Sequence, residues 1–450
     1  MANGTNREHW GSRLGFVLAA AGSAIGLGNI WKFPFITGKY GGAAFVMFYL
    51  VSILFIGAPV MLIEFAIGRK TQRNPVGAFR SLAPDKPYFL IGALGVIAGF
   101  IILSYYSVVA GWTLAYIYKA VAGGFAHFTS QEIAAESFKM YAANPIWPIL
   151  THAVFMFLCV IIVIKGVKSG IERWSVILMP TLFIIIILLV IRGVTLEGAE
   201  KGLAFLFQPD FSKLNGEAML VAMGHAFFTL SLGMGAMLTY GSYLGENENL
   251  LKSALWIVVM DTAVALLAGV AIFTAVFAMG FEPGAGPGLV FHVLPAIFAM
   301  MPAGYIVGIL FFMLLAIAAL TSGISLLEVV TAYFVDEKGM TRAKATVLFG
   351  VIIFLLGIPS ALSFGLMENV KLFNFTWFDF FDYLSFKYLL PLGGLLMVLF
   401  TIFRWGPANL LKELRRGNPT LESDVTKVVL FVSATFVALT LLAGILGWGG

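Results

Sequence analysis

Asp261 is the side chain whose position has the clearest chemical meaning. It is the single charged residue in the apolar run "ALWIVVMDTAVALLAG" at 254–269. If this run crosses a membrane, an ionised aspartate near its centre costs about 2.5–3.5 kcal/mol and marks a functional site by default. A cation is the natural partner of such a carboxylate. The alternative is a protonated structural aspartate that hydrogen-bonds to a neighbouring helix.

Two glycine-rich stretches could supply further ligands. "GSAIGLGN" at 22–29 interrupts an apolar run with three glycines and Asn29, and "FFTLSLGMGAMLTY" at 227–240 repeats the pattern with Ser231. Glycine disfavours a helix interior by about 1 kcal/mol relative to alanine. Unwinding in lipid frees backbone groups that lipid cannot satisfy, so a break must line a cavity or coordinate a ligand. Freed carbonyls suit cations and freed N–H groups suit anions, so one break could hold a zwitterion.

Helix packing is the competing explanation for the first stretch. Gly22 and Gly26 have the small-xxx-small spacing that is typical of close helix contacts in membranes. Packing accounts for the small residues, but it does not account for the polar side chains of Ser23 and Asn29. The polar residues and the repeat of the pattern favour a binding site.

Further polar atoms lie on two other apolar segments. Ala318, Thr321, Ser322 and Ser325 follow the i, i+3, i+4, i+7 spacing of one helix face, so their oxygens could form a row of ligands. Ordinary hydrogen bonds between helices would explain that stripe equally well. Tyr106 offers a buried hydroxyl that needs a partner, such as a carboxylate, although an interfacial tyrosine is the alternative.

Four charged residues near the ends of the apolar runs could form gates. Lys32 and Asp382 could close one side of a site, and Arg7 and Asp336 the other. Exposed ion pairs contribute about 0–1 kcal/mol, a strength that suits a contact required to open. Glu64 we interpret as a structural clamp.

The elements that must position these residues are membrane-spanning helices. Of the 450 residues, 60% are hydrophobic and 11% are charged, and mean hydropathy is +0.95. Soluble domains carry about 25% charged residues, so the composition predicts an all-α integral membrane protein. Runs long enough to span number about eleven. They lie near 14–36, 43–68, 88–120, 147–165, 174–192, 218–243, 253–280, 303–335, 343–360, 375–403 and 426–447.

Lysine and arginine placement predicts the orientation. Basic clusters such as "RKTQR" at 69–73 and "KELRR" at 412–416 fall in alternate loops, which predicts a cytoplasmic N-terminus and an external C-terminus in the plasma (inner) membrane. This asymmetry explains the net charge of +5 without a nucleic-acid partner. The lone Cys159 excludes disulfides and thiolate metal sites.

The interrupted runs are the first and the sixth, which open two successive sets of five. That correspondence is the sequence pattern of a transporter built from inverted repeats. We therefore expect one membrane domain over 1–450, with repeats at 12–192 and 217–404 and an eleventh helix at 426–447.

The chain resembles the neurotransmitter:sodium symporter family, in its bacterial amino-acid branch with the leucine-transporter-type fold. The likeness is carried by "REHWGSRLGFVLAAAGSAIGLGNIWKFPF" at 7–35, "GGAAFVMFYLVSILFIGAPVMLIEFAIGR" at 41–69, "FFTLSLGMGAMLTYGSYL" at 227–244 and "ALTSGIS" at 319–325. It covers nearly the whole chain in order. The resemblance implies a 5+5 inverted repeat with unwound first and sixth helices, and a transporter rather than an enzyme.

The resemblance also implies two sodium sites. The first would comprise Ala24, Asn29, Thr229, Asp261 and the substrate carboxylate. The second would comprise Gly22, Ile25, Ala318, Thr321 and Ser322. By the same likeness, residues from four helices would contact the substrate: Ala24, Leu27, Gly28, Ile102, Tyr106, Phe228, Thr229, Ser231, Met234, Ser322 and Leu326.

The expected activity is sodium-coupled import of an L-amino acid by alternating access, for which a monomer suffices. The apolar set Ile102, Phe228, Met234 and Leu326 predicts a hydrophobic, large or aromatic side chain, because a charged one would be left unpaired. Asp261 stands where relatives that need chloride carry a neutral residue, so we expect no chloride requirement. A transport-inactive amino-acid sensor of the same fold is the alternative.

Overall fold

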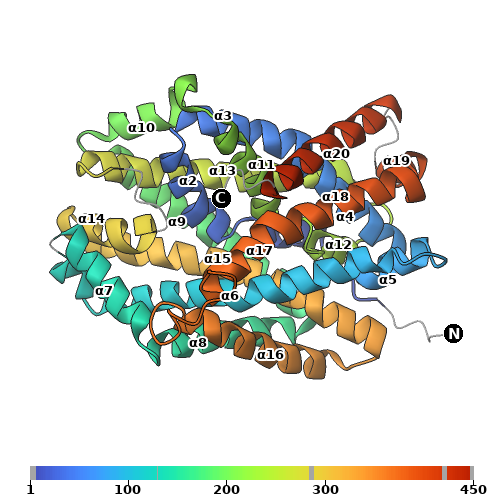
Figure 1. Ribbon diagram of the computed structural model, residues 1–450, viewed down its shortest axis with the longest axis horizontal. Coiled ribbons are helices and arrows are strands. Elements are labelled where there is room, and N and C mark those ends of the chain that lie inside the picture. Colours follow the sequence, from blue (N-terminus) through green and yellow to red (C-terminus); the bar gives the residue numbers. More distant parts are fainter. Residues whose placement is uncertain (1–6, 129, 283–287, 418–422, 446–450) are drawn as a thin grey trace.

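The computed structural model describes residues 7–128, 130–282, 288–417 and 423–445. Apart from one isolated bridge between Leu372 and Phe375, the described residues form helices and their connections. The helices run mainly along the long axis of the molecule (Figure 1). The predicted all-α architecture is confirmed.

Seven helices among the described residues are continuous, long and apolar enough to cross a membrane. Each coincides with a predicted span, and some contain a short π-helical turn. They are Ala43–Thr71 (α3, η2, α4), Phe89–Val121 (α6), Val167–Val194 (η4, α9), Leu250–Ala278 (α13), Gly304–Lys338 (α15), Arg342–Leu362 (α16) and Trp377–Trp405 (α17, η7, α18, η8).

The other four predicted spans fall on helices outside that set of seven. The first is the pair Arg13–Ala24 (α1) and Gly28–Lys39 (η1, α2), bent by 46°. The fourth, sixth and eleventh are Trp147–Val163 (α8), Gly216–Thr229 with Ala236–Gly241 (α11, α12), and Ser423–Ile445 (α20). Predicted residues 446 and 447 of the eleventh span lie outside the described residues.

Short helices that the hydropathy analysis did not predict lie between the spans. They are α5 (Pro75–Leu82), η3 (Gly124–His127), α7 (Gln131–Ala143), α10 (Ala199–Phe207), η5 (Phe211–Lys213), η6 with α14 (Leu289–Met300) and α19 (Pro407–Arg415). Helices α7, α10 and α14 gather at one end of the molecule, and α5 and α19 lie at the other (Figure 1). These elements cover the ends of the bundle.

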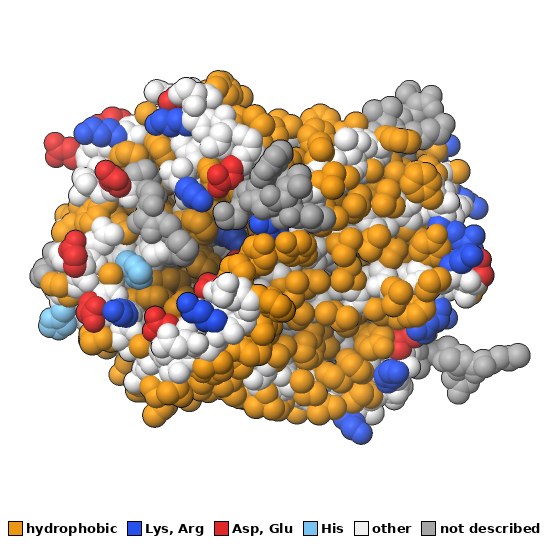
Figure 2. Space-filling view, in the orientation of Figure 1, with side chains coloured by type: hydrophobic (Ala, Val, Ile, Leu, Met, Phe, Trp, Pro, Cys, Tyr) orange, Lys and Arg blue, Asp and Glu red, His pale blue; other side chains and the backbone are white. Residues whose placement is uncertain are grey.

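The outer surface carries apolar side chains over its middle. Large hydrophobic residues on different helices are exposed, among them Phe157, Ile184 and Leu355. Figure 2 shows hydrophobic side chains over much of the visible face and charged ones mostly toward its two ends. In water such a surface would be costly, whereas lipid chains accept it.

Small residues let the core helices approach closely. Helix α6 packs beside α15, and its Gly95 approaches the interrupted sixth span. A Cβ atom at Gly95 of α6 would lie 3.3 Å from the backbone nitrogen of Gly235. Close backbone approach through glycine is the usual way in which membrane helices pack, because lipid supplies no hydrophobic drive. It brings α6 against the site described next.

Candidate functional site

The first span is interrupted at residues 25–27, named here the first break. Helix α1 ends at Ala24, and Ile25 is extended with φ −72° and ψ 101°. Helical structure resumes in η1 at Gly28. The predicted break is therefore confirmed, and it is shorter than the glycine-rich stretch that indicated it.

The sixth span is interrupted at residues 230–235, named the second break. Helix α11 ends at Thr229 and α12 begins at Ala236. Ser231, Gly233 and Gly235 have positive φ angles of 54°, 77° and 76°. Glycine adopts that region without steric cost, whereas serine needs support. The Ser231 hydroxyl donates to the Ser23 carbonyl at 2.7 Å, which supports this conformation and links the second break to the end of α1.

Glu64 on α4 satisfies the freed backbone of the second break. Its carboxylate is fully buried and accepts hydrogen bonds from the N–H groups of Gly233 at 2.8 Å and Leu238 at 3.1 Å. Buried N–H groups without a partner would each cost about 1–3 kcal/mol. Glu64 therefore acts as the clamp that the sequence predicted.

A cavity of about 20 Å³ lies between the two breaks. That volume is room for roughly one water molecule, so the lining side chains must move to admit anything larger. All the predicted substrate-contacting residues except Thr229 line it, and Ser23 and Gly26 line it as well. The full lining is Ser23, Ala24, Gly26, Leu27, Gly28, Ile102, Tyr106, Phe228, Ser231, Met234, Ser322 and Leu326.

The cavity has a polar and an apolar part. The buried Tyr106 hydroxyl accepts a hydrogen bond from the N–H of Leu27 at 3.2 Å, so two donors of the kind that a carboxylate needs are adjacent. Ile102, Met234 and Leu326 contribute hydrocarbon and thioether surface. This arrangement suits a ligand with a charged head and an apolar tail.

A first cluster of oxygen atoms surrounds Asp261, which is fully buried on α13. The Asn29 amide Nδ2 donates to an Asp261 carboxylate oxygen at 2.8 Å, and the Thr229 hydroxyl donates to the same carboxylate at 3.2 Å. The Asn29 Oδ1 accepts from the N–H of Gly26 at 3.0 Å and keeps a second lone pair. The structure thus brings together three side chains of the predicted first ion site.

A second oxygen cluster forms where α15 passes the first break. The Ser322 hydroxyl lies 3.4 Å from the Gly22 carbonyl, 3.0 Å from that of Ser23 and 3.5 Å from that of Ile25. One hydroxyl proton can serve only one of these acceptors. The Thr321 hydroxyl bonds to the Ala318 carbonyl at 3.1 Å and adjoins this group. Unsatisfied oxygens that converge in this way suit a hard cation.

Transition-metal ligands are not part of this arrangement. Within the described ranges, no group of three or more His, Cys, Asp or Glu side chains is placed to hold a metal ion. The oxygen atoms of the two clusters belong to carbonyl, hydroxyl and amide groups and to one carboxylate, that of Asp261. That donor set matches alkali and alkaline-earth ions better than zinc or copper.

Both predicted gate pairs are formed. The Lys32 ammonium lies 3.4 and 3.5 Å from the two Asp382 oxygens, and Tyr105 donates to the same carboxylate at 3.2 Å. At the other end, Arg7 pairs with Asp336. Both ion pairs that the predicted gates need are therefore present.

Several contacts at the Arg7 end were not predicted. Arg7 also donates to the Ser242 hydroxyl at 2.5 Å, and the Trp10 indole donates to the Tyr240 carbonyl at 3.0 Å. Trp10 and Tyr240 pack edge to face with ring centroids 5.2 Å apart. Trp10 belongs to a motif that carries the family resemblance, but the sequence did not indicate which residues Trp10 contacts, because those contacts depend on tertiary structure.

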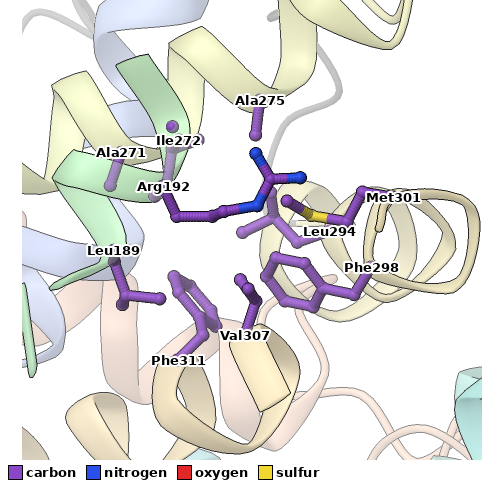
Figure 3. A pocket seen from close by; sticks show the side chains of 11 residues that line it. Leu189, Arg192, Ala271, Ile272, Ala275, Leu294, Phe298, Met301, Val307 and Phe311 are labelled. Carbon is purple, nitrogen blue, oxygen red and sulfur yellow. The ribbon is translucent and has the colours of Figure 1, made fainter. Parts of the chain in front are cut away.

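A second small cavity lies away from this site, among α9, α13, α14 and α15 (Figure 3). Its volume is about 20 Å³, and its lining is apolar except for Arg192. Arg192 donates to the Pro302 carbonyl at 3.1 Å and to the Thr195 hydroxyl at 3.3 Å. The arginine thus anchors the turn that precedes α15, and we assign this cavity no ligand.

Two interrupted helices around a small, mostly buried cavity, with oxygen clusters beside it, define a secondary transporter of the leucine-transporter type. The model of the "Sodium:neurotransmitter symporter family" matches residues 7–136 and 140–445, and the chain belongs to that family of sodium-dependent, multi-pass membrane transporters.

Individual relatives support this assignment. An uncharacterized sodium-dependent transporter of Bacillus subtilis, YhdH, is 44% identical over 91% of this chain and 90% of its own. A similar transporter of Haemophilus influenzae is 39% identical over 89% of this chain and 90% of its own. The crystal structure of MhsT in complex with L-phenylalanine matches with a TM-score of 0.90 and 46% identity, over 98% of this chain and 99% of MhsT. The likeness confirms the predicted 5+5 inverted-repeat fold.

Proposed function

We propose that this protein is a sodium-coupled symporter that imports a hydrophobic, large or aromatic L-amino acid by alternating access. The observation that carries the proposal is the convergence of both breaks on one cavity with polar donors at one side and apolar side chains at the other. The proposed role is transport, and it requires no bond-breaking chemistry.

Two sodium sites accompany the substrate in this proposal. The Asp261 cluster would hold one ion, with the Ala24 carbonyl, Asn29, Thr229 and the substrate carboxylate as further ligands. The Ser322 cluster would hold the other, with carbonyls of Gly22, Ile25 and Ala318 and the Thr321 hydroxyl. Because the substrate carboxylate completes the first shell, substrate and sodium should bind cooperatively.

The expected substrate follows from the apolar side of the cavity. A charged side chain would lose its hydration without gaining a partner there. MhsT has been crystallised with L-phenylalanine, which supports an aromatic or large aliphatic substrate for this chain too. Met234 is flexible enough to adapt when the cavity expands.

We further propose that transport does not require chloride. Asp261 places a fixed negative charge beside the first ion, so no mobile anion is needed to balance it. In the proposed orientation, in the plasma membrane, the N-terminus is cytoplasmic and the C-terminus external, and the Lys32 pair closes the outer side. One monomer holds the whole cavity and suffices for transport.

Uptake of radiolabelled L-phenylalanine into proteoliposomes tests the proposal. We expect accumulation with an inward sodium gradient and none when potassium replaces sodium. A transport-inactive sensor of the same fold would bind the amino acid with sodium but would not accumulate it. Binding without uptake would therefore favour the sensor over the symporter.

A further inference from the structure

The Lys32 ammonium lies between two aromatic rings. Its Nζ atom is 3.9 Å from the ring centroid of Phe386 and 4.8 Å from that of Phe228. The two rings are 6.0 Å apart and inclined by 63°. The lysine side chain is only 12% exposed, so most of its water has been replaced by these contacts. Ring faces attract cations most strongly where water is excluded.

The ion pair with Asp382 does not explain this position by itself. The two N–O distances, 3.4 and 3.5 Å, exceed the 2.7–2.9 Å or so of a strong charge-assisted hydrogen bond. The carboxylate is 38% exposed and shares an oxygen with the Tyr105 hydroxyl. Water at the exposed side of the carboxylate weakens its attraction for the lysine, so the ion pair alone is a weak restraint. Lys32 therefore combines a loose ion pair with a contact to the face of the Phe386 ring, 3.9 Å from its centroid.

Local backbone structure places Phe386 there. Helix α17 ends at Leu384, and the π-helical turn η7 spans Ser385–Leu389. Phe386 follows Asp382 by four residues, so both side chains lie on the same side of this helical segment and reach the same lysine. Wide turns of this type inside membrane helices are frequent at functional sites.

We propose that Phe386 is a gate residue that positions Lys32. It holds the ammonium over Phe228, which lines the cavity, and so keeps that side of the cavity closed. A compact ammonium fits between two rings, whereas a planar guanidinium would stack on one and fork toward Asp382. The inference rests on the proposed function in that the closed cavity is taken to retain an amino acid.

The test measures how fast tritiated L-phenylalanine leaves the purified protein in saturating sodium. Phe386→Leu keeps apolar volume and removes the ring, and we expect dissociation about fivefold faster. Phe386→Tyr keeps the ring face and should stay within about twofold of the wild type. Phe380→Leu on α17 is the matched control, because Phe380 contacts Phe373 and Phe381 and should leave the rate unchanged.

A double-mutant cycle assigns the effect to Lys32. If Phe386 acts through the ammonium, Phe386→Leu adds nothing in a Lys32→Met background. If Phe386→Leu accelerated dissociation equally in the Lys32→Met background, the ring would serve only packing and the inference would be overturned. The same conclusion would follow if Phe386→Tyr dissociated as fast as Phe386→Leu. A Phe386→Leu rate equal to that of the wild type would also overturn the inference.

A second readout needs no amino acid. The one native cysteine, Cys159, is buried, so a Cys159→Ala, Ile102→Cys protein reports access to the cavity through maleimide labelling. We expect Phe386→Leu to accelerate labelling about fivefold, and only when Lys32 is present. If the wild type binds no amino acid while labelling still accelerates, the proposed function fails and the gate inference stands. If the wild type binds the amino acid normally and Phe386→Leu does not change the labelling rate, the gate inference fails and the proposed function stands.

Discussion

The Glu64 carboxylate accepts a hydrogen bond from the backbone N–H of Gly233 at 2.8 Å. The partner of its other oxygen is the N–H of Leu238 at 3.1 Å, beyond the left-handed residues of the second break. One buried side chain therefore replaces hydrogen bonds that a continuous helix would have made itself. The stability of the unwound segment depends on this replacement.

Glu64→Gln should lower the thermal unfolding midpoint in detergent. The amide has one accepting oxygen, so one of the two N–H groups loses its partner at a cost of about 1–3 kcal/mol. Glu368→Gln changes an exposed carboxylate and is the control. A midpoint for Glu64→Gln equal to that of the control would contradict the clamp.

Thr321→Val should weaken sodium binding while leaving the fold intact. Valine keeps the shape of threonine and removes the hydroxyl beside the Ala318 carbonyl. Losing an interaction with a charged partner costs about 1.5–3 kcal/mol, so the half-saturating sodium concentration should rise about tenfold or more. Thr113→Val removes a buried hydroxyl that bonds only within α6 and should change nothing. If both variants had the same half-saturating sodium concentration, the Ser322 cluster would not be an ion site.

Asp261→Asn tests the charge at the first cluster. In wild-type protein, replacing chloride by gluconate should leave uptake unchanged. The asparagine variant should need about tenfold more sodium in gluconate, because an uncharged amide interacts with a cation less favourably by 1.4 kcal/mol or more. Asp379→Asn alters an exposed aspartate and serves as the control. Loss of wild-type uptake in gluconate would refute chloride independence.

Leu326→Phe should shift selectivity toward small substrates. Leu326 is buried in the cavity lining, and a larger side chain takes the space that an aromatic substrate needs. One methylene changes discrimination by about 1–3 kcal/mol, so L-phenylalanine should bind at least tenfold more weakly while L-alanine is little affected. Leu355→Phe, on the exposed face of α16, provides the comparison. A parallel loss for both amino acids would point to general damage instead.

Much of the site could be predicted because its residue types are unusual where they occur. Asp261, Asn29 and Ser231 are polar in apolar runs, and only a site or a hydrogen-bonded partner explains such residues. The breaks were indicated by glycines that a continuous helix would not favour. In the folded chain these residues lie within one small region.

The parts that were missed depend on contacts between distant segments. Phe386 looks like any lipid-facing aromatic residue until its distance from Lys32 is known. Gly26 was not among the predicted substrate contacts, yet its N–H meets Asn29 and its Cα faces Ser322 and Tyr106 across the cavity. The hydropathy analysis did not predict helices α5 and α7, because they are too short for a window of the length of a membrane span.

In the proposed mechanism, ions and a zwitterion take over the backbone groups that the two breaks release. Equilibrium binding of tritiated L-phenylalanine to the purified protein, titrated with sodium at constant ionic strength against potassium, tests this most directly. Binding should depend steeply on the sodium concentration, in keeping with two ions, and should be absent in potassium. Equal affinity for L-phenylalanine in sodium and in potassium would contradict the proposed mechanism.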